Sequence, residues 1–352
     1  MRTHVRVTAF LMGALLAIPQ LARPCSSLAF PNEDFLVFGA NYDNLLIPGQ
    51  LFINRRGVHK TGWEAGTTGK VASWVSRYGS VTISSTGYQL PWGGMNQAGL
   101  VFSTMYVPGT APPAPDERPP LMGVIWWQYM LDMCATIEEV RAASADIRLG
   151  DTVDHYLLCD RTGAAGVVEC IDGHLVIRMG RDLPVRALVN APYQELMVRW
   201  TERAPGPADP YSSGNRFSRL ADGMATFRGG STEEAVGYAF ELLAGVANAY
   251  TRWSFVCDTR DLVFYLKSFQ NPSLRFVDLK EIDFGCGRPT AMLDAHADLE
   301  GDITAAFHDY SHEEAAAHMV TAVAEARPDV PEEMIRQILA LLESFTCEQP
   351  GE

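Results

Sequence analysis

The sequence predicts an α+β fold, in which sheets pack face to face and helices lie outside them. Short runs of β-branched and aromatic residues, bounded by Gly, Pro, Asn or Asp, dominate the chain from Cys25 to about position 180 and are typical of strands. Helices and further strands follow without regular βαβ alternation, which disfavours a doubly wound parallel sheet. Hydrophobic residues make up 47% of the 352 residues and charged residues 20%, so a sizeable core is expected.

The first half of the chain supplies most of the predicted strands, which are Leu28–Phe30, Leu36–Gly39, Gln50–Asn54 and Ser80–Ser84. A Pro-rich loop is expected at 107–120. One helix is expected from Leu121 to about Ala143, because an apolar half precedes a polar half. Its Trp126, Trp127 and Tyr129 are interpreted as core. A hairpin with its turn at 160–163 and a strand at Leu175–Arg178 complete this half.

The second half is more helical. A loop at 203–215 precedes helices at about 216–227 and 232–246, and a hairpin of Ser254–Cys257 and Leu262–Leu266 follows them. After Pro289 the pattern is helical, at 311–326 and 331–345. We therefore divide the chain into a leader at 1–24, a main domain at 25–290 and a helical C-terminal extension at 291–352.

The leader has the order of residues found in a signal peptide. A basic flank precedes Phe10–Ile18, an apolar run too short to span a bilayer of about 30 Å, and a proline follows that run. We therefore expect a periplasmic or secreted protein. Signal peptidase prefers small residues before its cut, and cleavage directly before Cys25 would place Pro24 there. A cut after Ala22 would leave a two-residue remnant for a second trimming step.

The net charge restricts the partners that the protein can bind. The net charge is −14, and removal of the leader with its three arginines makes it three units more negative, which disfavours nucleic acid and anionic membranes. No later stretch predicts a membrane span. The expected partner is a small-molecule acyl amide, with assembly into a homo-oligomer left open.

Metal chemistry is not expected. The seven cysteines include no C-x-x-C pair, and Asp309 follows His308, so His308 and His312 do not form the zinc-protease pattern and are interpreted as surface residues. No metal or organic cofactor is predicted. Up to three disulfides are allowed in an oxidising compartment, and we expect Cys25 to be the cysteine left over.

Cys25 is the predicted nucleophile, because it lies at the end of the leader and opens the first strand. A Cys at a new N-terminus combines a thiol with an α-amine whose pKa is about 7.7–8.0. The amine can accept the thiol proton and later donate it to a leaving amine. Two alternatives remain for this position. One is a disulfide cysteine, and the other is the lipid-bearing cysteine of an envelope lipoprotein, which Arg23-Pro24 does not fit.

The segment Gly39-Ala-Asn-Tyr-Asp43 follows the second strand. At this point the chain resembles the choloylglycine hydrolase and penicillin V acylase family of linear amide C–N hydrolases. That family has a nucleophilic Cys on its first strand and then a Gly-Arg-Asn-aromatic-Asp motif. The resemblance implies that Asp43 orients the nucleophile and its amine. Ala40 stands where the family usually has a basic residue, so a cation that would lower the thiol pKa or contact substrate is missing.

Further segments match the family in order, at 74–82, 93–100, 189–193 and 212–219. The resemblance implies that Tyr106 and Asn190 form the oxyanion hole, while Arg216 supports the charge near the nucleophile. Bile-salt hydrolases tend to have Asn at the position of Tyr106, and penicillin V acylases Tyr.

The resemblance implies a four-layer αββα N-terminal-nucleophile hydrolase fold with two antiparallel sheets over residues 25–290. The implied reaction forms a thioester on Cys25, which water then hydrolyses. Tyr106 and the short tract between Asn190 and Arg216 favour penicillin V or N-acyl homoserine lactones as substrates, with conjugated bile salts as the alternative. Because Ala40 removes a cation, an inactive acyl-amide binding protein is the alternative from another class.

Overall fold

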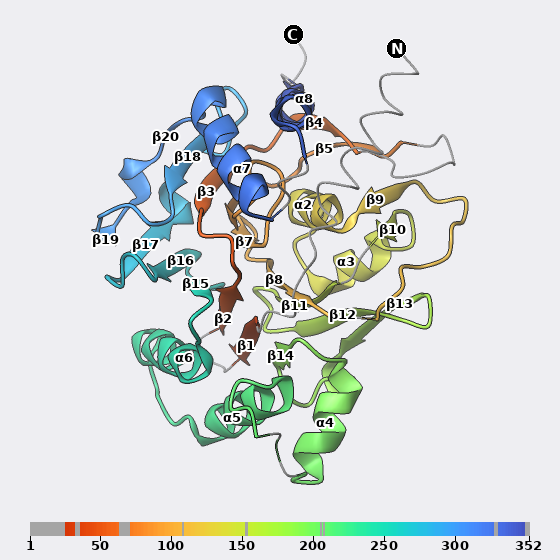
Figure 1. The fold of residues 1–352 in the computed structure, drawn as a ribbon, viewed down its shortest axis with the longest axis vertical. Helices are drawn as coiled ribbons and strands as arrows, with labels where there is room; N and C mark the ends of the chain where they lie inside the picture. The colour runs from red at the N-terminus through yellow and green to blue at the C-terminus, as the bar shows by residue number, and fades with distance from the viewer. Residues whose placement is uncertain are drawn as a thin grey trace.

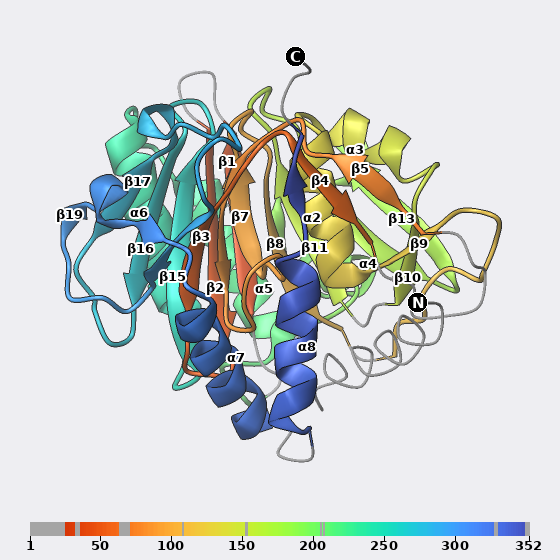
Figure 2. The ribbon, with the colours of Figure 1, turned by 90° about the horizontal axis from the view of Figure 1, so that it is seen from above.

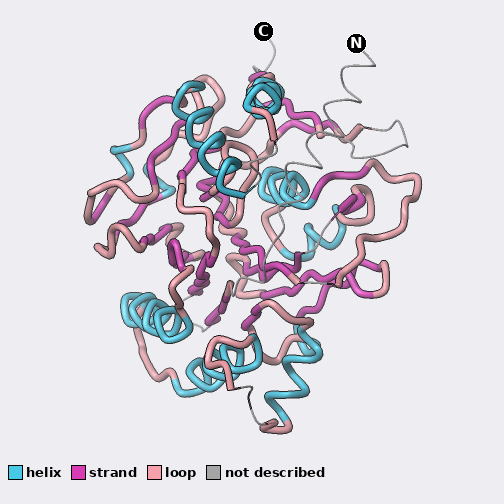
Figure 3. The backbone as a smooth tube through the Cα atoms, viewed as in Figure 1, coloured by secondary structure: helices cyan, strands magenta, loops and turns pink. Residues whose placement is uncertain are grey.

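The structure is a computed structural model, and it describes residues 25–31, 36–62, 71–107, 109–151, 154–204, 206, 208–326 and 330–348. The predicted signal peptide lies outside these residues. Two large sheets lie between two sets of helices, as Figure 1 shows. Figure 3 shows the same arrangement, with the strands grouped in the middle of the molecule and the helices outside them. The predicted four-layer αββα fold is confirmed.

The first large sheet contains the strand that follows Cys25. Its seven strands, in spatial order, are β14 (Ala187–Val189), β1 (Ser26–Pro31), β2 (Leu36–Asp43), β15 (Thr251–Asp258), β16 (Val263–Ser268), β17 (Arg275–Asp278) and β19 (Gly301–Asp302). Neighbours are antiparallel except β17 and β19. Because Ser26 lies opposite both Val189 and Asn41, β1 brings the ends of β14 and β2 together.

The second large sheet is antiparallel throughout and has nine strands. In spatial order they are β13 (His174–Met179), β12 (Ala165–Ile171), β11 (Asp154–Cys159), β8 (Val101–Tyr106), β7 (Gly93–Asn96), β6 (Ser80–Ser84), β3 (Gln50–Asn54), β18 (Ala291–Asp294) and β20 (His308–Asp309). The domain boundary at 290 stays a prediction. The structure adds that β18, just beyond it, pairs with β3 inside the sheet.

Helices cover the outer faces of both sheets. The first sheet is covered by α4 (Tyr193–Thr201), α5 (Ser213–Thr226) and α6 (Thr232–Val246). The second is covered by α2 (Gly123–Met133), α3 (Ile137–Ala143), α7 (His312–Ala326) and α8 (Glu332–Leu342). The last two lie side by side in Figure 2. Smaller elements are β4 (Val58–Thr61), β5 (Ser73–Val75), β9 (Pro120–Met122), β10 (Arg148–Asp151), β21 (Thr346–Cys347) and the 3₁₀ turns Gly180–Asp182, Leu279–Glu281 and Thr304–Ala306.

Alternation along the strands divides the core into two parts. On β3, Leu51 and Ile53 join the core between the sheets, whereas Phe52 faces the core under the helices of the second sheet. Because both faces are covered, β3 is an apolar run with few exposed atoms, which is the pattern that predicted it. Trp126 and Trp127 are buried in the second core, as predicted.

The single helix predicted over 121–143 is wrong. The structure has a short strand, β9, and two separate helices, α2 and α3. Asn96 of β7 donates through Nδ2 to the carbonyl oxygen of Cys134, which satisfies a backbone group where α2 ends. Thr136 then caps α3, because its hydroxyl accepts from the backbone N–H of Glu139. The break therefore depends on a residue from another strand and on a local cap.

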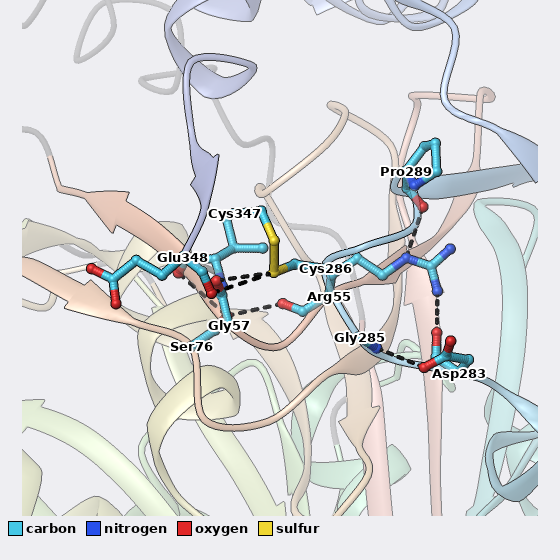
Figure 4. The surroundings of a disulfide bond; sticks show 10 residues. Arg55, Gly57, Ser76, Asp283, Gly285, Cys286, Pro289, Cys347 and Glu348 are labelled. Carbon is cyan, nitrogen blue, oxygen red and sulfur yellow. Dashed lines mark hydrogen bonds between the residues drawn. A yellow bond between two sulfur atoms is a disulfide. The ribbon is translucent and has the colours of Figure 1, made fainter. Parts of the chain in front are cut away.

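One disulfide, between Cys286 and Cys347, joins β21 to the loop that precedes β18 (Figure 4). The backbone supports the junction, since the N–H of Glu348 donates to the carbonyl oxygen of Gly57 on the adjacent loop. The remaining five cysteines are free and buried, namely Cys25, Cys134, Cys159, Cys170 and Cys257. Cys25 is therefore free as predicted, but it is not alone, and one disulfide is present where up to three were allowed.

Candidate active site

The β1–β2 hairpin places Cys25 beside Asp43. Cys25 immediately precedes β1 and Asp43 ends β2, and the antiparallel register brings these ends together. The backbone N–H of Asp43 lies 3.5 Å from Cys25 Sγ, and the thiol lies 3.7 Å from the Asp43 carbonyl oxygen. Both residues are buried, with 7% and 1% of their surfaces exposed. The sulfur is thus held by backbone groups of the predicted orienting residue.

The carboxylate of Asp43 is only partly satisfied. Its Oδ2 accepts a hydrogen bond of 3.0 Å from Nδ2 of Asn248, in the loop between α6 and β15. Its Oδ1 is buried and accepts no hydrogen bond from the residues that the structure describes. Burial raises the pKa of Asp43 to about 7, although the polar side chains of Thr251 and Asn248 and the charge of Arg216 lower it. A buried carboxylate oxygen without a donor is unusual, so this one marks a place for a donor.

Arg216 binds the backbone of Cys25 and the side chain of Ser26. It lies in the first turn of α5, which Ser212 caps. Its Nη1 donates to the carbonyl oxygen of Cys25 at 2.5 Å and to Ser26 Oγ at 2.8 Å, while its Nη2 donates to Asn190 Oδ1 at 3.0 Å. Burial lowers the pKa of Arg216 to about 10, so the guanidinium is still a cation near neutral pH.

These contacts fix which way the Asn190 amide faces. A guanidinium only donates, so Oδ1 of Asn190 must face Arg216 and Nδ2 must face the opposite way. Nδ2 donates to the carbonyl oxygen of Tyr106 at 2.9 Å. Tyr106 ends β8, so the contact joins the two sheets at the site. The donor side of the amide therefore faces the carbonyl oxygen of Tyr106.

All five predicted site residues lie in one connected group. Hydrogen bonds link Cys25 to Asp43 and to Arg216, Arg216 to Asn190, and Asn190 to Tyr106. Their catalytic roles remain predictions.

The surroundings of the Cys25 thiol disfavour its ionised, thiolate form. The pKa of Cys25 is raised to about 12, mainly by burial and also by the charges of Asp43 and Asp154, although the charge of Arg216 lowers it. Ala40 is fully buried on β2, opposite Ser27, and contributes no charge. The thiol therefore needs a proton acceptor close by before it can act as a nucleophile near neutral pH.

Sequence reasoning missed Asn248 and Asp154. Asp154 opens β11 opposite Tyr106, and Asn248 reaches Asp43 across 205 positions of sequence.

The interpretation of His308 and His312 as surface residues is confirmed by their exposure. Among the described residues no cluster of His, Cys, Asp and Glu could hold a metal ion, and no helix is long and apolar enough to cross a membrane.

The raised pKa of Asp43 predicts a pH-dependent stability in a chain that retains a residue before Cys25. The folded state holds this proton up to about pH 7, whereas the usual pKa is 3.8. The free energy of unfolding is therefore expected to fall as the pH rises from about 4 to 7, by at most about 1.4 kcal/mol per pH unit, and then to level off. Urea denaturation at several pH values should show a smaller fall in Asp43→Asn. Equal slopes in the two proteins would exclude Asp43 as the source.

The chain is similar to known proteins in sequence and in fold. The chain is 26% identical over 266 residues to a penicillin V acylase from Pectobacterium atrosepticum, which covers 60% of this chain and 69% of that protein. A penicillin V acylase structure from Agrobacterium tumefaciens superposes with a TM-score of 0.71 at 24% identity, over 82% of this chain and 98% of that one. A conjugated bile acid hydrolase from Clostridium perfringens superposes with a TM-score of 0.63 at 15% identity, over 79% and 98%. No protein-family model matches the chain.

Proposed function

We propose, since the chain belongs to the choloylglycine hydrolase and penicillin V acylase family, that it hydrolyses a linear amide C–N bond with Cys25 as an N-terminal nucleophile. The observation that supports this most is the buried Oδ1 of Asp43, which accepts no hydrogen bond from the described residues and belongs to the residue that contacts the Cys25 sulfur. Removal of the residues before Cys25 would create an α-amine there. That amine is the donor that the carboxylate lacks.

The reaction then follows from the contacts. The amine accepts the thiol proton, and the sulfur attacks the amide carbonyl carbon. The negative charge that forms on the carbonyl oxygen is stabilised by Nδ2 of Asn190 and the backbone N–H of Tyr106. The amine next protonates the leaving nitrogen, and a thioester remains on Cys25. Water, activated by the same amine, hydrolyses the thioester and regenerates the thiol.

Arg216 contributes without touching the sulfur. Its hydrogen bonds to the Cys25 carbonyl oxygen and to Asn190 fix the position of the oxyanion donor relative to the nucleophile. Its positive charge stabilises the thiolate form of Cys25, which burial and the charge of Asp43 destabilise. Because all five site residues come from one chain, the mechanism does not require a homo-oligomer.

For the substrate we propose penicillin V or an N-acyl homoserine lactone, with conjugated bile salts as the alternative. A penicillin V acylase is 26% identical to this chain over 266 residues, and Tyr106 stands where such enzymes tend to have Tyr. For the location we propose the periplasm or the exterior. The leader has the pattern of a signal peptide, and the Cys286–Cys347 disulfide fits an oxidising compartment.

The decisive experiment compares two chains that differ by one residue. One begins at Cys25, and the other carries a single glycine ahead of it. Release of phenoxyacetate from penicillin V, and of acyl groups from homoserine lactones and bile-acid amides, is measured for both. We expect turnover only by the chain that begins at Cys25. Equal turnover would disprove the role of the amine, and substrate binding without turnover by both would favour the inactive binding protein.

Intact mass of the exported protein tests the lipoprotein alternative. The proposal expects a chain that begins with an unmodified Cys25. A lipid adduct on this residue would instead identify an envelope anchor.

A further inference from the structure

A second buried polar group lies behind the oxyanion donor, in the space between the two sheets. His155 of β11 and Glu169 of β12 are 1% and 3% exposed. Nδ1 of His155 lies 3.2 Å from Oε1 of Glu169. Along their strands they alternate with residues of the helix-covered core and share the inner face with Leu157 and Val167. Their hydrogen bonds go to each other and to Val189, Tyr193 and Arg178, so the proposed reaction does not use these side chains directly.

Both side chains bind the segment that carries Asn190. We call residues 189–193 the Asn190 turn, which runs from the last residue of β14 to the first of α4. His155 Nε2 lies 2.7 Å from the carbonyl oxygen of Val189 and must be the donor, because a carbonyl only accepts. Glu169 Oε1 accepts from the backbone N–H of Tyr193 at 2.8 Å. The two contacts therefore fix the turn on either side of Asn190.

The Glu169 carboxylate is well suited to this place. It faces the N-terminus of α4, where unpaired N–H groups attract negative charge. Its Oε2 also accepts from Arg178 of β13 at 3.3 Å. Although burial raises the pKa of Glu169, its hydrogen bonds with His155, Tyr193 and Arg178 hold that pKa below the usual value. The carboxylate is thus ionised near neutral pH and bound by three partners.

We propose that His155 and Glu169 are positioning residues, which hold the Asn190 turn so that the Asn190 amide lies in register with Cys25. This inference rests on the proposed function, since it assigns Asn190 an oxyanion role. The connection runs from Glu169 and His155 to the turn, and from Asn190 to Arg216 and the nucleophile. Displacement of the turn by a fraction of an ångström would move the donor away from the developing charge.

The kinetic test combines His155→Phe with Asn190→Ala. His155→Phe keeps a ring of similar size and removes the donor, and we expect kcat to fall about 10- to 100-fold with little change in KM. Asn190→Ala alone should lower kcat about 10²- to 10³-fold. If His155 acts through Asn190, the double variant should match Asn190→Ala. Multiplied effects, or an unchanged kcat in His155→Phe, would overturn the proposal.

Two further variants separate positioning from general destabilisation. His155→Gln retains an N–H for the Val189 carbonyl, so we expect it to recover most of the lost kcat. Leu157→Ala removes a buried side chain from the same face of the same strand. Leu157→Ala should lower the free energy of unfolding by an amount similar to that in His155→Phe, without changing kcat. A kcat loss in Leu157→Ala equal to that in His155→Phe would indicate a merely structural role.

Hydrogen exchange decides the inference independently of turnover. In His155→Phe the amides of the Asn190 turn, that of Tyr193 above all, should exchange faster than in the wild type and in Leu157→Ala. Unchanged exchange would overturn the inference. If the wild type released no acyl group from any amide, the proposed function would fail, and the exchange result would still show whether His155 holds the turn.

Discussion

Cys25→Ala is expected to lower kcat for amide hydrolysis by at least about 10⁴-fold, because loss of a nucleophile removes the covalent step altogether. The rest of the site should persist. Arg216 binds the Cys25 carbonyl oxygen and Ser26, and Asn190 binds Tyr106, none of them through the sulfur. The variant should therefore still bind substrate, which isothermal titration with penicillin V would detect. Release of phenoxyacetate followed over hours gives the residual rate.

A second buried cysteine supplies the matched control. Cys257 lies fully buried on β15 of the same sheet and is also a free thiol. Cys257→Ala should cost some stability by leaving a small cavity, but it should leave kcat within about twofold of the wild type. A Cys25→Ala protein that hydrolyses amides at the wild-type rate would refute the nucleophile. Inactivation by Cys257→Ala but not by Cys25→Ala would point to another thiol.

Lys60→Met is expected to lower the free energy of unfolding by about 3–5 kcal/mol, because it leaves a buried carboxylate without its cation. Lys60 Nζ lies 2.8 Å from Oδ2 of Asp132 on α2, and the two side chains are 1% and 0% exposed. Burial lowers the pKa of Lys60 and raises that of Asp132. Trp74 and Gln128 also donate to the carboxylate, so Asp132 keeps part of its hydrogen bonding. Guanidinium denaturation measures the change.

An exposed pair provides the comparison. Arg141 and Glu138 lie 2.8 Å apart on α3, with 64% and 60% of their side chains exposed. Arg141→Met should change the stability by less than about 1 kcal/mol, since water already screens the pair. The double variant Lys60→Met with Asp132→Asn should lose less than the sum of the single losses, which reports their coupling. If Lys60→Met were as mild as Arg141→Met, the buried pair would contribute nothing specific.

The parts of the fold that the sequence predicts well are those whose signal is local. Apolar strands bounded by turn residues, such as β3 and the hairpin of β15 and β16, appear where the pattern places them. Short strands such as β18 were missed, because four residues carry little periodicity and become a strand only by pairing with β3. The break between α2 and α3 was missed for a related reason, since Asn96 reaches it from another strand.

The candidate site shows the same division. Cys25 immediately precedes β1 and Asp43 ends the adjacent strand β2, and the motif around Asp43 made both predictable. Asn248 has no motif of its own and meets Asp43 only because β2 and β15 are neighbours in the sheet. The pairing of Cys286 with Cys347, 61 positions apart, likewise follows from tertiary packing. Contacts of this kind have no signature in one sequence.

The hydrogen bond from Arg216 to the Cys25 carbonyl oxygen has a consequence for how the enzyme would be activated. That contact, the bond from Arg216 to Ser26 and the approach of the Asp43 N–H to the sulfur all use atoms that leader removal leaves unchanged. A dormant precursor would therefore already contain the finished framework. If the predicted leader is removed, proteolysis would have to supply only one basic nitrogen and would need no refolding. Maturation would then change the chemistry of the site and leave its geometry unchanged.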